Sequence, residues 1–178
     1  MNVIISPNPL LHEISAPVEV GDKSIKKLVK QMAKTMYKQD GVGLAAVQVG
    51  VLKRVIVMDC DYVRLDEDDN YLPKNLIVMI NPEIVCHSEN KIACGEGCLS
   101  VPGINVDIKR YKEVEVKAMD ENFQEFTIKA SAKDLLGRCI QHEMDHLDGI
   151  TILDSAEGAA KFQALQDYDN YLEENGLK

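Results

Sequence analysis

Two histidines four residues apart, near the C-terminal end of the chain, could hold a metal ion. They lie in the segment 141–149, QHEMDHLDG, where Glu143 directly follows the first histidine. On an α-helix, residues four apart lie on the same face, so His142 and His146 can point their ring nitrogens at one place. Glu143 is rotated about 100° around the helix, where its carboxylate can act as general base on a water that the metal activates. The pattern predicts a metal site with hydrolytic chemistry.

Two imidazoles are too few ligands, and several residues could supply a third. Cys98 ends the segment GEGC at 95–98, where two glycines let the backbone approach closely. A nearby divalent metal also lowers the pKa of a thiol and so stabilises the thiolate. Cys94 is a rival, because Cys94 and Cys98 with two histidines would form a closed structural zinc site. The spacing favours Cys98 alone; His12 and His87 are upstream candidates without a supporting local pattern.

The residues around the metal motif predict the helix that it needs. Ser131, with Asp134 three residues later, resembles a capping box and predicts a helix that begins at Ser131. Gly149 stands where this helix would end. The stretch 150–153 is expected to form a strand. A last helix is expected from about residue 156 to 173, with four apolar residues on one side: Phe162, Leu165, Tyr168 and Leu172.

The rest of the chain contains one further helix and several short apolar strands. Ser24 is expected to cap a helix whose apolar residues keep a helical period. Strands are expected at 55–58, at 76–80 and 83–86 around Asn81-Pro82, and in a hairpin formed by 114–118 and 126–128. Strands outnumber helices without regular alternation. We therefore expect an α+β fold, with antiparallel β-sheets packed around the central α-helix that carries the HExxH metal motif.

Length and composition limit the classes of protein that fit. A chain of 178 residues with 46% hydrophobic residues fits one domain, spanning residues 1–178. The net charge of −9 argues against a nucleic-acid surface and against binding to anionic membranes. We find no signal peptide and no apolar run near the roughly 18–20 residues of a membrane span. Five cysteines, an odd number without an export signal, favour a reducing, cytoplasmic location. The acidic stretch 61–74 is expected to be a solvated loop.

Three segments of the chain resemble the three motifs of the peptide deformylase family. They are GVGLAAVQ at 41–48, EGCLS at 96–100 and QHEMDHLDG at 141–149, in the family's order and at similar spacing. The surrounding sequence is also similar, so the resemblance covers nearly the whole chain. It implies a metal-dependent hydrolase that removes the N-formyl group from the N-terminal formylmethionine of newly synthesised proteins and releases formate.

The resemblance also implies which residues do the chemistry. The metal would be held by one thiolate and two imidazoles, those of Cys98, His142 and His146. Glu143 would be the acid and base, and the Gln48 side chain and the backbone N–H of Leu99 would face the developing oxyanion. Family members use ferrous iron and also accept zinc, nickel or cobalt. The methionine side chain would enter a pocket lined by four residues: Val42, Gly43, Leu135 and Cys139.

The residues around the ligands and the partners of the protein follow from the same resemblance. Glu96 and Arg110 are expected to form an ion pair that holds the cysteine loop, and Asp145 could join them. The substrates would be N-formylmethionyl peptides of nascent chains. A transient ribosome contact is also implied, although this chain has an acidic C-terminal segment where some members carry a basic helix.

Two other functions fit the same residues. The first is a different metallohydrolase, such as a small peptidase that cuts internal or unformylated peptides. The second is a non-enzymatic module held together by a structural metal, with Cys94 as the fourth ligand.

Overall fold

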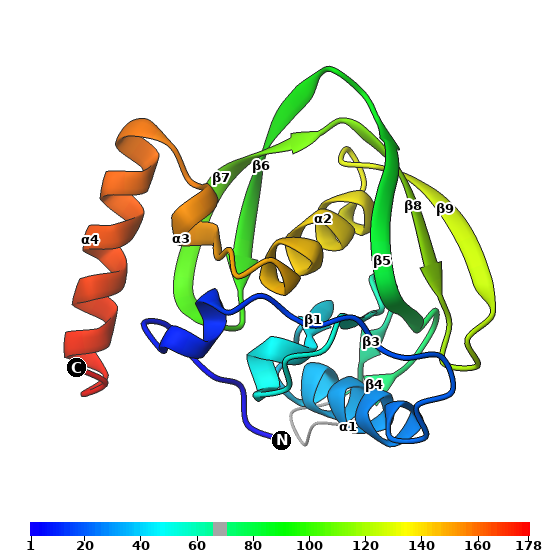
Figure 1. The fold of residues 1–178 in the computed structure, drawn as a ribbon. Coiled ribbons are helices and arrows are strands. Elements are labelled where there is room, and N and C mark those ends of the chain that lie inside the picture. Colours follow the sequence, from blue (N-terminus) through cyan, green and yellow to red (C-terminus); the bar gives the residue numbers. More distant parts are fainter. Residues whose placement is uncertain (66–70) are drawn as a thin grey trace.

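Antiparallel sheets surround one central helix in the computed structural model, which describes residues 1–65 and 71–178 (Figure 1). The predicted α+β fold class is therefore confirmed. Part of the acidic stretch 61–74, the segment 66–70, lies outside the described residues. The elements in chain order are η1 (Pro9–His12), α1 (Ile25–Lys38), β1 (Gly43–Ala45), η2 (Ala46–Val49), β2 (Val55–Met58), β3 (Val63–Arg64), β4 (Tyr71–Leu72), β5 (Ile77–His87), β6 (Lys91–Cys98), β7 (Val101–Tyr111), β8 (Glu113–Met119), β9 (Glu125–Ser131), α2 (Leu135–Leu147), α3 (Ile152–Ser155) and α4 (Gly158–Glu174).

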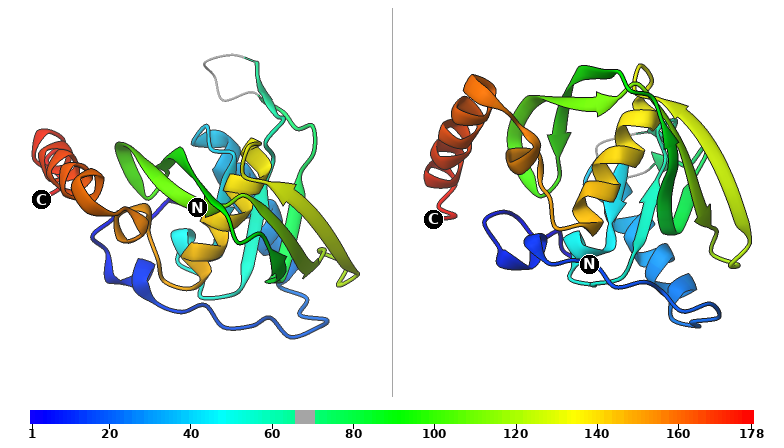
Figure 2. Two further views of the ribbon diagram at one scale, coloured as in Figure 1. Left: turned by 90° about the horizontal axis from the view of Figure 1, so that it is seen from above. Right: turned by 45° about the horizontal axis from the view of Figure 1, so that its top comes forward.

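The strands form one large sheet and two hairpins. The large sheet has the order β1-β2-β5-β8-β9, and every neighbouring pair in it is antiparallel. Strands β6 and β7 form a separate two-stranded sheet, as do β3 and β4. Helix α2 packs against β1, β2 and β9, and both figures show it between the large sheet and β6–β7 (Figures 1 and 2). The metal motif is thus held between two layers.

Helix α1 forms where its apolar period predicts a helix. Its apolar residues are buried against β1 and β2, while its remaining face is exposed. Ser24 does occupy the N-cap position, but its side chain does not cap the helix. The Ser24 hydroxyl donates instead to Asp22 Oδ1 at 2.6 Å. The predicted position of this helix is confirmed, and the predicted cap is wrong.

Strand β5 is one long strand where two were expected. It runs through Asn81-Pro82 because Asn81 adopts a φ of 51°, and the pairing with β8 shifts register between Ile80 and Glu83. The Asn81 side chain compensates by bonding the backbone of Val18, accepting from its N–H at 2.8 Å and donating to its carbonyl at 2.9 Å. The bulge therefore bends the strand without ending it.

Helix α2 begins later than the sequence predicts. Ser131 is the last residue of β9 and pairs with Glu113, so the helix starts only at Leu135, with Asp134 in the N-cap position. Gly137 permits this tight junction, because a Cβ there would lie 2.2 Å from the Ser131 carbonyl oxygen. Gly149 follows the helix with a φ of 74°, as expected of a residue just beyond a helix end.

The C-terminal segment differs from the prediction in two ways. Residues 150–153 do not form a strand, because Thr151 starts the short helix α3, where its backbone N–H and its hydroxyl both donate to Asp154 Oδ2. On α4, Leu172 is buried against β7, but Phe162 is 70% exposed and Leu165 is 46% exposed. Helix α4 stands at the edge of the molecule, so only part of the predicted apolar side contributes to the core (Figure 2). No helix in residues 1–65 and 71–178 has the length and apolar character needed to cross a membrane.

Candidate metal centre

Three potential ligands converge from two layers of the fold. Cys98 is the last residue of β6, and His142 and His146 lie one turn apart on α2. Their ligand atoms all lie within 4.8 Å of one another, and Cys98 Sγ is 3.1 Å from His146 Nε2. A metal with bonds of about 2.0–2.3 Å to sulfur and nitrogen fits such a triangle. Because three ligands leave a fourth position for water or substrate, the arrangement suits an open site.

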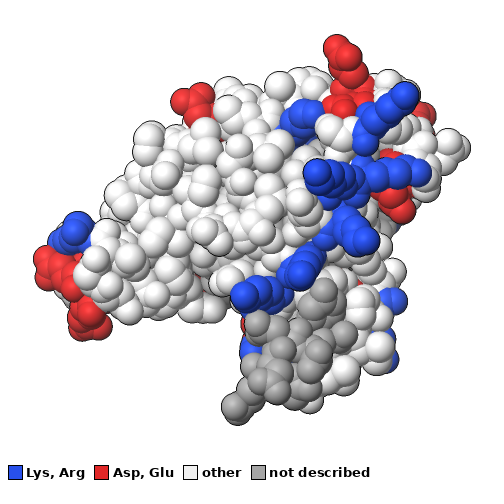
Figure 3. Space-filling view, turned by 90° about the horizontal axis from the view of Figure 1, so that it is seen from below, with Lys and Arg blue, Asp and Glu red and all other residues white. Residues whose placement is uncertain are grey.

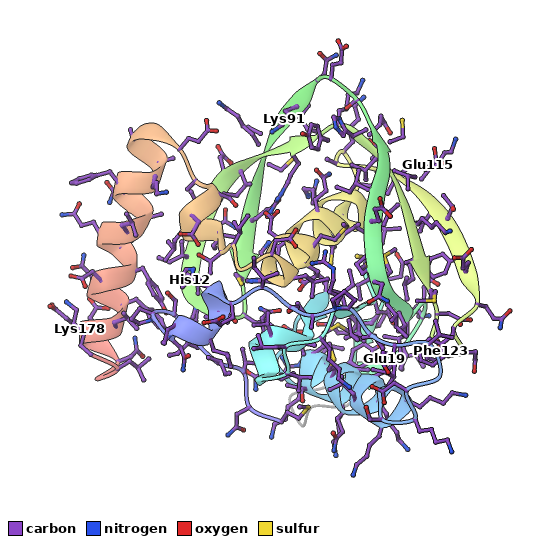
Figure 4. The ribbon with its side chains drawn as sticks, viewed as in Figure 1. His12, Glu19, Lys91, Glu115, Phe123 and Lys178 are labelled. Carbon is purple, nitrogen blue, oxygen red and sulfur yellow. The ribbon has the colours of Figure 1, made fainter. Side chains whose placement is uncertain are left out.

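The other candidate ligands lie elsewhere. Cys94 is outside this cluster, and its thiol donates to the Ala132 carbonyl at 3.5 Å. His87 stacks on Tyr111 with the ring centroids 3.8 Å apart. His12 lies on η1 (Figure 4), where its Nδ1 is 3.2 Å from the Gly149 carbonyl oxygen, and it is not part of the ligand cluster. The structure therefore brings together the predicted ligands and separates the rivals from them.

A buried ion pair orients the first histidine. His142 Nδ1 lies 2.9 Å from Glu96 Oε2, so the ring can donate there and leave Nε2 for a metal. Arg110 donates to both oxygens of Glu96, at 2.7 and 2.8 Å, and to Asp145 Oδ2 at 2.5 Å. Burial opposes the charge on Glu96, but the bonds from Arg110 and His142 outweigh it and lower the pKa of Glu96 to about 2. The carboxylate is therefore fixed in its ionised form.

The ligand cluster favours a positive charge at its centre. Burial opposes charge on His142, yet its interactions with Cys98 and the nearby carboxylates raise the pKa of His142 well above its usual range. Burial, reinforced by the charge of His142, lowers the pKa of His146 well below its usual range, so its ring is neutral. A divalent cation would satisfy the same field, with both imidazoles neutral and the thiol ionised, as ligation requires.

Glu143 lies beside the ligands. It is only 4% exposed, and burial raises the pKa of its carboxyl to about 7. Its Oε2 has no hydrogen-bond partner in the described part of the chain, although the atom is fully buried. A buried carboxylate oxygen without a partner is costly, which indicates that it faces a water or a substrate group. Gly43 makes room for it, because a Cβ at Gly43 would lie 2.5 Å from Glu143 Oε1 and from Cys139 Sγ.

Gln48 presents its amide nitrogen to the same place. It lies on η2 and is 1% exposed. Its Oε1 accepts from the backbone N–H of Ala45 at 2.8 Å, while its Nε2 donates to the Ser100 hydroxyl at 3.1 Å and lies 3.6 Å from Cys98 Sγ. With its oxygen engaged by the backbone, the amide can turn only its N–H groups toward the ligand cluster.

A cavity of about 370 Å³ opens onto these groups. Leu99, in the turn between β6 and β7, lines it, together with Gln48, Glu143 and two of the metal-ligand candidates. The residues predicted to receive a methionine side chain all line the same cavity: Val42, Gly43, Leu135 and Cys139. The charged residues Asp40 and Arg138 also line the cavity.

Known proteins share this sequence and fold. A family model described as "Polypeptide deformylase" matches residues 1–162. A peptide deformylase of Bartonella bacilliformis is 36% identical over 177 residues, which cover 99% of this chain and 95% of that protein. The crystal structure of a peptide deformylase from Legionella pneumophila superposes with a TM-score of 0.83 at 35% identity, over 99% of this chain and 98% of that chain. The chain belongs to the peptide deformylase family.

Membership of the deformylase family establishes the reaction. The chain is a hydrolase that removes the formyl group from N-terminal methionine. The family is metal-dependent, and Cys98, His142 and His146 form a group that could hold the ion. The resemblance predicted from the three motifs is therefore confirmed. Among curated relatives, "Peptide deformylase 1" of Nostoc sp. is 47% identical over 139 residues, 78% of this chain and 69% of that protein.

Sequence reasoning missed one group of this deformylase site. Ser100 is fully buried and connects the site to both ends of the chain. Its hydroxyl holds the Gln48 amide, and its backbone carbonyl accepts from the N–H of Ser6 at 2.8 Å. The Ser6 carbonyl in turn accepts from the Tyr168 hydroxyl of α4 at 2.6 Å. The only sequence signal for this role was that Ser100 ends the EGCLS segment. The residues that bond to Ser100 are distant from it in the sequence.

Proposed function

We propose that residues 1–178 act as one catalytic domain, in which a single divalent metal is held by Cys98, His142 and His146. The observation that carries this proposal is the convergence of these three ligand atoms beside a buried carboxylate oxygen of Glu143 that lacks a partner. One thiolate and two imidazoles form a donor set suited to iron, zinc, nickel or cobalt. We propose Fe²⁺ as the native ion, with Zn²⁺, Ni²⁺ or Co²⁺ as substitutes, because the resemblance of the three motifs to the family implies these ions and the donor set suits them.

The proposed mechanism divides the work among the residues of the cavity. When bound, the metal acts as a Lewis acid that lowers the pKa of water to about 7 and so supplies a nucleophile at neutral pH. Glu143 would take a proton from the attacking water, whose oxygen bonds to the formyl carbon, and would pass it to the amine that departs as the carbon–nitrogen bond breaks. The Gln48 amide and the backbone N–H of Leu99 donate to the formyl oxygen as negative charge develops there; loss of one such donor typically costs about 10²–10³ in rate.

The substrate is an extended N-formylmethionyl peptide. Its methionine side chain enters the part of the cavity that is lined by Val42, Gly43, Leu135 and Cys139. Small residues at 41–43 allow the peptide backbone to lie along this segment in a strand-like pairing. Both contacts place the formyl group near the ligands.

The partners and the location follow from this substrate. The peptides are the N-formylmethionyl ends of nascent chains, which places the enzyme in the cytoplasm. A transient contact with the ribosome is also part of the proposal. The described α4 does not resemble a basic docking helix, because Asp167, Asp169, Glu173 and Glu174 outnumber its one lysine.

A pair of cysteine variants tests the metal ligands. Formate release from formyl-Met-Ala-Ser and metal content would be measured on protein purified without oxygen. Cys98→Ala should lose both the metal and the activity, whereas Cys94→Ala, in the same strand, should keep both. Loss of metal from Cys94→Ala would support a structural site instead. Cleavage of unformylated peptides without formate release would favour a different metallohydrolase.

A third variant tests the acid and base. Glu143→Ala should keep the metal, because its carboxylate is not among the ligands, but turnover should fall by about 10²–10⁴, the usual contribution of such a group. Full activity of this variant would contradict the role of Glu143.

A further inference from the structure

One face of α1 carries a row of lysines. This basic face comprises six exposed residues on α1 and the turn before it: Lys23, Lys26, Lys27, Lys30, Lys34 and Lys38. Figure 3 shows Lys and Arg side chains in a row across this side of the molecule, with Asp and Glu side chains among them at one end. The net charge of −9, which argued against a nucleic-acid surface, hides this local concentration of positive charge.

Few acids offset the charges of the basic face: Asp120 interacts electrostatically with Lys26, and Glu121 lines the same surface hollow as Lys26, Lys30 and Lys34. Helix α1 contains no Asp or Glu. The acids that flank it are engaged elsewhere, since Asp22 pairs with Lys53 and Asp40 pairs with Arg64. Within residues 1–65 and 71–178, no ion pair joins a lysine of the basic face to an acid, and Lys26 only donates to the amide oxygen of Asn122, at 2.8 Å.

The spacing of these lysines is unfavourable for the helix alone. Lys26, Lys30, Lys34 and Lys38 follow one another at intervals of four, so they stand in one row on the helix surface. Like charges at this spacing destabilise a helix, and cations near its N-terminus oppose the helix dipole. An anionic partner along the row would remove both penalties.

We propose that the basic face of α1 docks on the phosphate backbone of double-helical RNA. From Lys23 to Lys38 the face is about 22 Å long, too long for one small anion but matched to a row of phosphates. A nucleic-acid duplex carries charge at a density of about one per 1.7 Å, so several lysines can engage at once. The exposed residues of the face include no aromatic side chain for stacking on bases, so docking is independent of sequence.

The burial of α1 disfavours its insertion into an anionic membrane. A helix that lies on a membrane inserts an apolar face among the lipids. The apolar side of α1 is already buried in the core, where Ile25, Met32 and Met36 have no exposed surface. The exposed side carries lysines but no large apolar side chain that could enter the lipid layer. This favours a polyanion whose charges lie on its surface.

The position of the basic face relates it to the substrate. Lys38 ends α1, three residues before Gly41, which lines the catalytic cavity. A docked RNA would therefore lie close to the mouth of the cavity, on the side where Gly41 and Val42 receive the peptide. This inference extends the proposed ribosome contact by naming a surface for it, and it does not depend on the metal ligands.

The test measures binding of a labelled 20-base-pair RNA duplex to the metal-loaded, full-length protein by fluorescence anisotropy. The wild-type protein should bind in 50 mM KCl and lose about 10²-fold in affinity by 200 mM, as expected for four or five phosphate contacts. The variant Lys30→Glu/Lys34→Glu should bind at least tenfold more weakly in 50 mM KCl, with a shallower dependence on salt. Lys30→Arg/Lys34→Arg should bind like the wild type.

A matched control separates local charge from net charge. Lys117→Glu/Lys129→Glu changes the net charge equally, but on β8 and β9, where Glu125 and Glu115 already pair with these lysines; it should bind RNA like the wild type. Equal weakening by the two glutamate variants would overturn the proposal, as would no binding by the wild type in 50 mM KCl. If Lys30→Glu/Lys34→Glu lost binding to phosphatidylserine vesicles but still bound RNA like the wild type, the result would overturn the proposal in favour of a membrane. All variants should release formate from formyl-Met-Ala-Ser normally, because the basic face lies outside the cavity.

Discussion

The buried carboxyl of Glu143 couples the chemistry of the site to the stability of the protein. Its pKa is raised by burial from 4.5 to about 7, so the native state binds this proton more tightly than the unfolded chain. Such a group favours the native state below pH 4.5, and this contribution is lost as the pH rises through 7. At pH 8 the loss amounts to about 3 kcal/mol, from a difference of roughly 2.5 pKa units.

Replacing Glu143 with glutamine should therefore stabilise the metal-free protein at alkaline pH. We expect Glu143→Gln to exceed the wild type in free energy of unfolding at pH 8, by an amount that shrinks toward zero near pH 4, because glutamine carries no charge to bury. Urea denaturation at both pH values, after treatment with a chelator, measures the difference. A gain of equal size at pH 4 and pH 8 would argue against titration of Glu143 as its source.

The hydroxyl of Ser100 should matter for rate more than for substrate binding. It holds the Nε2 of Gln48 at 3.1 Å, so Ser100→Ala would free the amide to rotate away from the formyl oxygen. We expect kcat to fall roughly tenfold, less than the 10²–10³ for losing an oxyanion donor outright, with KM and metal content unchanged. Ser15→Ala is the matched control, since the Ser15 hydroxyl is also buried but has no partner in the described part of the chain. A rise in KM without a change in kcat would contradict this role.

Among the elements, β1 and α2 approach so closely that one residue sets their separation. A methyl group at Gly43 would press on the Glu143 carboxylate and the Cys139 thiol, at 2.5 Å from each. We expect Gly43→Ala to lower kcat/KM at least tenfold, because a small displacement of a catalytic group is costly. The metal content should stay the same, because neither contacted group is a ligand. Steady-state kinetics and metal analysis test this, and wild-type turnover would show that the two elements can separate without loss.

Arg110 joins three elements through its two carboxylate partners. It lies on β7, and it bonds Glu96 on β6 and Asp145 on α2. Arg110→Leu leaves the buried Glu96 without its cation, which typically costs 3–5 kcal/mol. We expect lower stability and faster loss of metal to a chelator, because Glu96 would no longer hold His142 in place. Unchanged metal retention and turnover would show that Arg110 does not help to hold the metal ligands in place.

The elements also show where sequence patterns reach their limit. The helical spacing of His142 and His146 and the buried strand Val55–Met58 could be predicted, because both follow from local periodicity. The start of α2 could not, because pairing of Ser131 with Glu113 extends β9 into the apparent capping box. The partner of Ser100 was equally hidden, since Gln48 is 52 residues away.

At the scale of the whole molecule, one hydrogen bond connects the two ends of the chain. The Tyr168 hydroxyl on α4 donates to the Ser6 carbonyl, and both residues are buried. Tyr168→Phe would leave that carbonyl without its partner, so we expect a loss of about 1–2 kcal/mol in the free energy of unfolding, with kcat unchanged. Tyr171→Phe, on the same helix, is the control and should change little. Urea denaturation checks both, and equal losses would show that the bond to Ser6 is not the cause.

Total charge is a whole-molecule property that does not describe any one surface. A sum of −9 describes long-range repulsion, but salt screens charges beyond about 8 Å in physiological buffer. The distribution over the surface therefore decides local contacts, and it emerges only when α1 is placed with its lysines outward.

The ligand triangle draws one thiolate from the β6–β7 sheet and two imidazoles from a helix that packs on the larger sheet. An ion bound there would link two layers whose strands do not hydrogen-bond to each other. Part of its binding free energy would therefore be folding free energy. Ion affinity and the melting temperature should then rise and fall together across variants of the hairpin, even when those variants touch neither the ligands nor the substrate.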